Sequence, residues 1–419
     1  MLEQTMALCR QYIAGFGAPS THLCYHHRLD GPRGEAALSP PEEIRLGHVA
    51  GKPRPYGYGS GIQDAALENG QFLYALCEAY ETTRNPELAE MARYIFSGMK
   101  RIATVSPVKG FVPRGPHPNG KSYYPDSSRD QHCAFIEAMW RYAKSPVGRL
   151  EDRAFAAEAV HNTVSRMERN NWILNVEDNS RMAHVGWGWT QHTMIGAATL
   201  LMAVGAAGDA TGRAHWWERY RDFGTEKAGI RWQLLDAETF DDWRPFTLYS
   251  NQFASSLDVI AKVEPHAARR AAVRAFMGAM ARRALGTNVL DPACWRRLDW
   301  AADWKDEELE PILQTFGLSL TRPATVFELP AHFKPEYMDL RDWRRRKVAE
   351  KLLYGIPTVA FHKALLSGDP RCIAAVTPPV EAMVETMRVH GHRYERGENM
   401  NRTVILGLLL LARSEGTRQ

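Results

Sequence analysis

Apolar residues recur along most of the chain at intervals of three and four positions, whereas strict alternation of apolar and polar residues is scarce. This pattern predicts a mainly α-helical protein. A helix of small apolar residues is expected over 62–83, and it stops near Asn85-Pro86. A more polar, amphipathic helix follows over 86–104. We expect the first helix to lie inside the molecule and the second to cover it.

The same alternation of an inner and an outer helix recurs along the chain. The pairs are 130–143 with 151–172, 190–207 with 212–223, 250–262 with 265–285, and 355–366 with 370–388. A last apolar helix is expected over 401–413, and its outer partner would be the amphipathic N-terminal segment 2–16. Six such hairpins predict an all-α (α/α)6 toroid, a single catalytic domain over 1–419. The alternative is an open solenoid of helix pairs, which would carry capping repeats at its ends.

Long loops lead into the inner helices from one side of this predicted ring. They cover 18–60, 105–129, 173–189, 224–249 and 286–346, and the last is a long insertion at the rim. Loops longer than about 15 residues are usually functional. We therefore expect the functional site at this rim.

The distribution of charged and apolar residues argues against nucleic acids and membranes as partners. The chain has 52 Lys and Arg against 48 Asp and Glu, and these charges are dispersed, so no nucleic-acid partner is expected. The longest apolar run, 404–412, is far shorter than the roughly 20 residues of a membrane span, so no membrane partner is expected. The N-terminal segment lacks the features of a signal peptide, and the six cysteines are scattered. Buried, reduced thiols and a cytoplasmic location are expected.

Motifs for the common cofactors do not occur. The sequence has no HExxH, no Cys/His cluster with metal spacing, no GxxxxGK[ST], no GxGxxG after a strand and no GxSxG. We therefore predict that the protein uses neither a metal nor a cofactor.

Two loops that lead into inner helices carry carboxylates at the helix starts. In one, a glycine-rich segment precedes Asp64 and Glu68, which are four residues apart and share a helix face. In the other, Asp130 follows a segment that contains Ser127 and Ser128. Helix capping by these serines and Asp130 is the simpler interpretation. If the helices converge on an axis, however, Asp64 and Asp130 face one cavity, where two carboxylates can share a proton.

The remaining loops supply aromatic rings, amides and guanidinium groups before the other inner helices, at 187–192, 246–252 and 399–402. Aromatic faces stack on sugar rings, while amides and guanidinium groups bind hydroxyls and carboxylates. This chemistry favours an oligosaccharide ligand. The residues that we expect to bind it are Arg129, Gln131, His132, Asp126, Glu68, Tyr124, Trp187, Trp189, His192, Tyr249, Asn251 and Arg402.

With Gly61-Ile62-Gln63-Asp64 and Ser127-Ser128-Arg129-Asp130-Gln131 in these places, the chain resembles the six-hairpin glycosidase-like superfamily. It is most similar in pattern to the unsaturated glucuronyl and rhamnogalacturonyl hydrolases. The resemblance implies that one Asp protonates a vinyl ether and the other activates water, and Asp64 and Asp130 match these positions. The local strings differ, because Gln63 stands where the family has a His and Arg129 directly precedes Asp130.

These observations predict a glycoside hydrolase that acts on a uronic-acid-containing or similarly polar oligosaccharide. Asp130 is expected to be the principal acid/base and Asp64 its partner. One alternative is a sugar epimerase or polysaccharide lyase on the same toroid, which would use histidines such as His192 and His362. Another is a helical-repeat binding protein without catalytic activity.

Overall fold

The computed structural model describes residues 1–54, 56–183, 186, 189–237, 248–286, 288–290, 307 and 356–414. Within these ranges, helices rich in small and apolar residues form an inner layer. They are α3 (Ala65–Thr83), α5 (Arg129–Lys144), α7 (Met194–Thr211), α9 (Leu248–Val263), α13 (Ile356–Ser367) and α15 (Glu398–Ser414). The helices that cover them are α4 (Pro86–Val105), α6 (Leu150–Arg169), α8 (Ala214–Gln233), α10 (Ala267–Leu285), α14 (Pro370–His390) and α1 (Leu2–Phe16).

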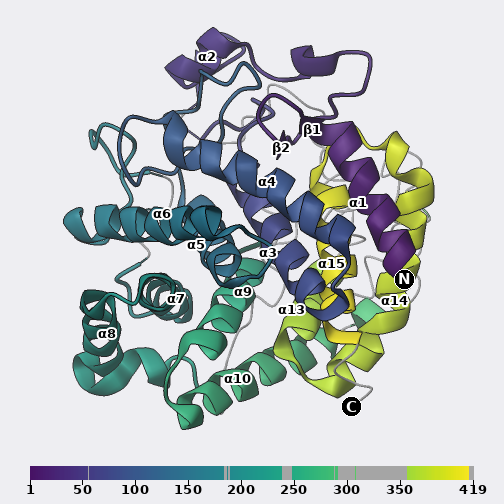
Figure 1. The fold of residues 1–419 in the computed structure, drawn as a ribbon. Coiled ribbons are helices and arrows are strands. Elements are labelled where there is room, and N and C mark those ends of the chain that lie inside the picture. Colours follow the sequence, from purple (N-terminus) through teal and green to yellow (C-terminus); the bar gives the residue numbers. More distant parts are fainter. Residues whose placement is uncertain are drawn as a thin grey trace.

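The inner helices close into a ring. Each packs against the next in chain order, from α3 through α5, α7, α9 and α13 to α15, and α15 packs back against α3. The N-terminal helix α1 contacts α14 and α15, and so becomes the outer helix of the last hairpin (Figure 1). The fold is therefore an all-α (α/α)6 toroid, as predicted. An open solenoid would leave α3 and α15 apart.

Side-chain contacts show that the inner helices run parallel. At their N-terminal ends, Gln131 at the start of α5 bonds to Asp64 beside α3. At their C-terminal ends, Glu78 of α3 forms ion pairs with Arg141 of α5 and Lys262 of α9. One face of the ring is therefore formed by helix starts and the loops before them, and the other by helix ends.

Local sequence explains where several helices begin and how closely they pack. The Asn85 side chain accepts a hydrogen bond from the backbone of the first turn of α4, and the Thr193 hydroxyl does the same for α7. Gly70 lies where α3 meets α5, and a Cβ there would stand 2.7 Å from the Ala134 carbonyl oxygen. The small residues of α3 thus allow the two backbones to approach each other.

Helix α7 is long and apolar enough to cross a membrane by length and composition alone. Here it lies in the inner ring between α5 and α9, and most of its residues are buried. Burial on nearly all sides explains its apolar composition. The cysteines that the structure describes, Cys9, Cys24, Cys77, Cys133 and Cys372, are buried and free, and Cys294 lies outside the described residues.

Most helix bounds lie within about three residues of the predicted ones, and the larger differences fall on α7 and α8. Helix α8 continues to Gln233, beyond the expected end at 223, because it consists of two helical pieces joined by non-helical backbone at Glu226, Lys227, Ala228 and Gly229. Helix α7 starts at Met194 rather than 190, because Thr193 caps it. Most of the predicted rim insertion, 286–346, lies outside the described residues. The exceptions are 286, 307 and the short helix η2 (Asn288–Leu290).

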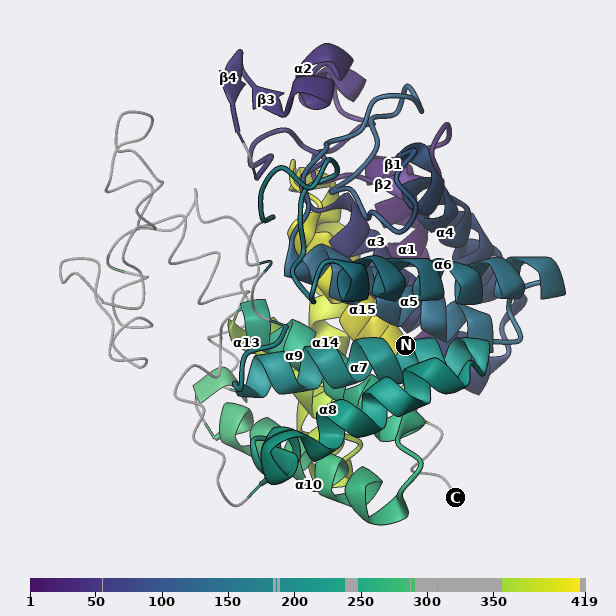
Figure 2. The same ribbon diagram turned by 90° about the vertical axis from the view of Figure 1, so that its left-hand side faces the viewer.

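The loop before α3 has short elements that the sequence pattern did not predict. They are β1 (Gly17–Ala18) paired with β2 (Leu23–Cys24), the short helix η1 (Gly34–Ala37), α2 (Pro41–Leu46), and β3 (His48–Val49) paired with β4 (Lys52–Pro53). Both strand pairs are antiparallel. The α2, β3 and β4 elements lie at one end of the ring (Figure 2). A further short helix, η7 (Gly391–Arg393), precedes α15.

Candidate active site at the helix starts

A buried amide joins the two predicted carboxylate positions. Asp64 directly precedes α3, and Asp130 lies in the first turn of α5. Between them, the fully buried Gln131 donates through Nε2 to Asp64 Oδ1 at 3.0 Å and to the Gln63 carbonyl at 3.3 Å. Its Oε1 accepts from the backbone of Leu67 at 2.8 Å. Gln131 therefore fixes the start of α5 and the Asp64 carboxylate relative to each other.

Asp64 is a partly exposed carboxylate whose pKa the surroundings shift strongly. Its side chain retains 22% exposure, so a solute can reach it. Burial raises the pKa of Asp64 to about 7; the Arg114 guanidinium, 3.7 Å away, opposes the rise, and the negative charge of Asp130 adds to it. Asp64 consequently exchanges its proton near neutral pH, as a general acid or base must.

Asp130 is held in a different way. Its Oδ1 accepts hydrogen bonds from the Ser128 hydroxyl and from the Gln131 backbone, the latter at 3.0 Å. The simple capping interpretation is wrong for the serines: Ser128 makes no side-chain capping bond, and Ser127 donates instead to the Val112 carbonyl at 2.6 Å. The Ser128 hydroxyl thus orients the Asp130 carboxylate rather than capping the helix.

Arg114 is a functional candidate that sequence analysis missed. Only 1% of it is exposed, and it donates to the Gln63 carbonyl at 3.1 Å and the Ser127 carbonyl at 3.3 Å. It therefore ties the loops before α3 and α5 together while placing its charge beside Asp64. Its neighbour Gly115 allows this approach, since a Cβ there would stand 2.6 Å from the Ala65 Cβ. A lone Arg between Pro and Gly in a long loop gives no sign in the sequence that it is buried.

Glu68, predicted to bind substrate, is occupied within the protein. It is 5% exposed, and its Oε1 lies 3.2 Å from His26 Nδ1. Burial works to lower the pKa of His26, but the bond to Glu68 outweighs burial and raises this pKa to about 9. The two side chains therefore form a buried ion pair that joins the first long loop to α3. The sequence offered His26 only as one of two adjacent histidines in a long loop.

Asp126 and His132 shape the loop before α5. Asp126 is 1% exposed and pairs with Arg181 at 2.5 Å. His132 is also buried, with Nδ1 3.0 Å from Ser127 Oγ and 3.1 Å from the Ser128 carbonyl oxygen. Burial lowers the pKa of His132 to about 4, so its ring is neutral. Internal partners occupy both side chains in this structure, and direct binding of substrate by them stays a prediction.

Two of the predicted stacking rings are also buried. Tyr124 is fully buried, and its hydroxyl donates to the Gly47 and Arg54 carbonyls. A Cβ at Gly57 would lie 3.2 Å from the Tyr124 ring, so the glycine-rich loop packs directly on it. Trp189 is likewise 0% exposed. Neither ring presents a face to a ligand in this structure.

The remaining predicted ligands are more widely spread. Arg402 pairs with Glu398 on α15, and the Arg129 carbonyl accepts a hydrogen bond from Gln252 at 3.3 Å. His192 precedes α7 instead of lying within it, and its Nε2 is 3.3 Å from Glu226. Predictions for Trp187 and for the side chains of Tyr249 and Asn251 fall outside the described residues, although the backbone of the latter two belongs to α9.

Comparisons with known proteins add one distant similarity. No protein-family model matches the sequence, and no curated protein matches it. Among solved structures, cellobiose 2-epimerase from Spirochaeta thermophila DSM 6192 matches with 14% identity and a TM-score of 0.36. The match covers 53% of this chain and 61% of that protein. The assignment of the fold rests on the closed ring of helix contacts described above.

The chemistry available at the helix starts is that of paired carboxylates. One of them, Asp64, is partly exposed and titrates near neutral pH, and the charge of the other acts on it. Among the residues described by the structure, no group of three His, Cys, Asp or Glu side chains lies close enough to hold a metal ion. Proton transfer between these carboxylates and a ligand is the reaction that this arrangement favours.

Proposed function

We propose that the protein is a glycoside hydrolase that acts on a uronic-acid-containing or similarly polar oligosaccharide. The observation that carries the proposal is the placement of Asp64 and Asp130 on either side of Gln131, with the pKa of Asp64 raised to about 7. Asp64 is then the general acid. The sequence predicts instead that Asp130 is the principal acid/base and Asp64 its partner. Asp130 accepts two hydrogen bonds through Oδ1 and is the general base.

In the proposed reaction, Asp64 transfers its proton to the glycosidic oxygen as the bond from that oxygen to the sugar carbon breaks. Asp130 takes a proton from a water molecule whose oxygen attacks the same carbon. One water molecule is thereby added across the bond, and a proton passes in net from Asp64 to Asp130. Exchange with solvent then restores both groups. Arg114 and Gln131 act as positioning residues, because each holds Asp64 by a direct contact.

The test is turnover by Asp64→Asn and Asp130→Asn of aryl glucuronides and unsaturated uronyl disaccharides. Each variant is expected to lose about 10²–10⁴-fold in kcat/KM, the usual contribution of a general acid or base. Asp152→Asn is the matched control, because Asp152 lies on outer helix α6 and pairs with Lys100 at 3.6 Å. Unchanged turnover in both aspartate variants refutes the proposal. Loss in the control as well would mean that the assay reports stability.

Product analysis separates the alternative reactions. A hydrolase adds the mass of water, a lyase creates an absorbing double bond, and an epimerase leaves the mass unchanged. The histidines considered for an epimerase gain no support from their positions: His362 is buried midway along α13 with its pKa lowered to about 4, and His192 precedes α7. A binding protein without activity would be expected to have an open groove and no such pair of carboxylates.

A further inference from the structure

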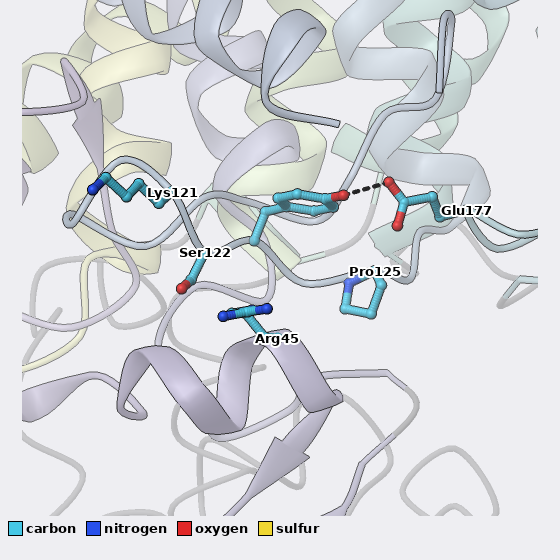
Figure 3. A pocket seen from close by; sticks show the side chains of 6 residues that line it. Arg45, Lys121, Ser122, Pro125 and Glu177 are labelled. Atoms are coloured by element: carbon cyan, nitrogen blue, oxygen red, sulfur yellow. Dashed lines mark hydrogen bonds between the residues drawn. The ribbon is translucent and has the colours of Figure 1, made fainter. Parts of the chain in front are cut away.

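A cavity lies beside the loop that leads to Asp130. Its volume is about 330 Å³, within the range of small-molecule sites. It is formed where α2, the loop before α5 and the segment after α6 meet (Figure 3). The lining residues are Arg45, Lys121, Ser122, Tyr123, Pro125 and Glu177.

The charges around this cavity favour an anion. In the part of the chain that the structure describes, neither the Arg45 nor the Lys121 side chain forms a hydrogen bond or an ion pair. The one carboxylate, Glu177, is already engaged, since its Oε1 accepts from the Tyr123 hydroxyl at 2.5 Å and from the Ser106 hydroxyl. Arg45 and Lys121 are therefore cations without such partners that line a cavity whose acidic group accepts hydrogen bonds from hydroxyls; Figure 3 shows the Lys121 ammonium group directed away from Arg45.

The Tyr123 ring gives the cavity a flat aromatic wall. Its hydroxyl is fixed by the hydrogen bond that it donates to Glu177 Oε1. Burial, together with the hydrogen bond to Glu177, raises the pKa of Tyr123 to about 12, so the phenol stays a neutral donor. In contrast to Tyr124, which is fully buried, Tyr123 is only half-buried. It can therefore stack on the apolar face of a sugar ring.

The cavity is physically linked to the carboxylate site. Pro125 lines the cavity, and Asp130 follows it by five residues, so their Cα atoms are at most roughly 17 Å apart. The Glu177 backbone also donates to the Pro125 carbonyl at 3.4 Å, which couples the cavity wall to this loop. The cavity and Asp130 therefore lie on one loop.

We propose that this cavity is a second subsite, which binds a carboxylate-bearing sugar unit of the oligosaccharide. Arg45 binds its carboxylate, Lys121 adds positive charge at the edge of the cavity, and Tyr123 stacks on its ring. The inference rests on the proposed function, because it treats the cavity as an extension of the same substrate site. It explains why an acidic sugar, rather than a neutral one, would be selected.

The experiment measures binding of sodium glucuronate by calorimetry to the full chain, with glucose and inorganic sulfate as comparison ligands. The variants are Arg45→Met combined with Lys121→Met, and Tyr123→Leu. Lys109→Met is the matched control, because Lys109 is an exposed cation, 72% exposed, that does not line the cavity. Thermal unfolding of each variant checks its folding, which these substitutions of largely solvent-accessible cations should not disturb.

Support requires that glucuronate binds at least about tenfold more tightly than glucose, a difference of 1.4 kcal/mol. The double variant and Tyr123→Leu should lose this binding, and Lys109→Met should retain it. Equal binding by the double variant overturns the inference. The inference is also overturned if sulfate binds as tightly as glucuronate and Tyr123→Leu does not change the affinity for glucuronate. The cavity would then be a general anion site. Binding is measured without turnover, so this test is independent of hydrolysis. If Asp64→Asn is inactive but still binds glucuronate, the inference about the cavity stands whether or not the proposed hydrolysis is correct.

Discussion

The ion network at the C-terminal ends of the inner helices should contribute strongly to stability, and Asp258 is its central residue. This carboxylate is fully buried, and it lies 3.0 Å from Lys262, 2.8 Å from Arg274 and 3.8 Å from Arg413. It also accepts from the Tyr74 hydroxyl at 2.5 Å. These partners come from α3, α9, α10 and α15. One side chain therefore connects the first inner helix of the chain, α3, with the last, α15.

Asp258→Asn keeps the size of the side chain but removes its charge. The three cations then lose their common partner in a buried setting, and breaking such a network typically costs about 3–5 kcal/mol. We expect a loss of this size in the free energy of unfolding, measured by urea titration with circular dichroism. Glu81→Gln is the control, because Glu81 also belongs to the network through Arg141 but is 35% exposed. It should cost less than about 1 kcal/mol.

The reasoning would be refuted if Asp258→Asn lost less free energy of unfolding than the control, or if both variants were as stable as the wild type.

The dependence of stability on pH gives an independent check. Burial favours a raised pKa for Asp258, but Lys262, Arg413 and Arg274 outweigh burial and hold this pKa well below its usual range. A carboxyl whose folded-state pKa is depressed stabilises the protein above its unfolded pKa, and this stability is lost as the pH falls. The variant should therefore lose less stability on acidification below pH 4 or so than the wild type.

Three further predictions follow from buried contacts. Arg114→Met should raise the pKa of Asp64 further by about one unit, as measured by carboxyl ¹³C NMR, and an unchanged value would contradict the electrostatic role of the guanidinium. Burial raises the pKa of Glu137 to about 8 against 4.5 in the unfolded chain, so wild-type stability should fall as the pH rises between these values; Glu137→Gln should flatten this slope in urea unfolding. Gly70→Ala places a methyl group 2.7 Å from the Ala134 carbonyl oxygen and should cost about 1–3 kcal/mol in thermal unfolding, whereas wild-type stability would disprove the close approach of α3 and α5.

Periodicity was sufficient to predict most of the helices. The expected segments 86–104 and 2–16 correspond to α4 (Pro86–Val105) and α1 (Leu2–Phe16), because capping and apolar spacing act over a few residues. The second piece of α8 was missed, since the backbone at Glu226 and the next three residues interrupts the periodic signal. The short strands of the first long loop have two residues each and show no alternation to detect.

At the candidate site, sequence and tertiary structure contributed different things. The sequence by itself determined that acidic residues stand at the starts of two inner helices, because helix starts have a local signature. Only the tertiary structure decided that Gln131 and Arg114 hold Asp64, that His26 occupies Glu68, and that Tyr124 faces inward. Those outcomes depend on pairs of residues that are tens of positions apart, and on the burial that ring closure imposes. Protonation and exposure are properties of that packing, so no local pattern of residues can encode them.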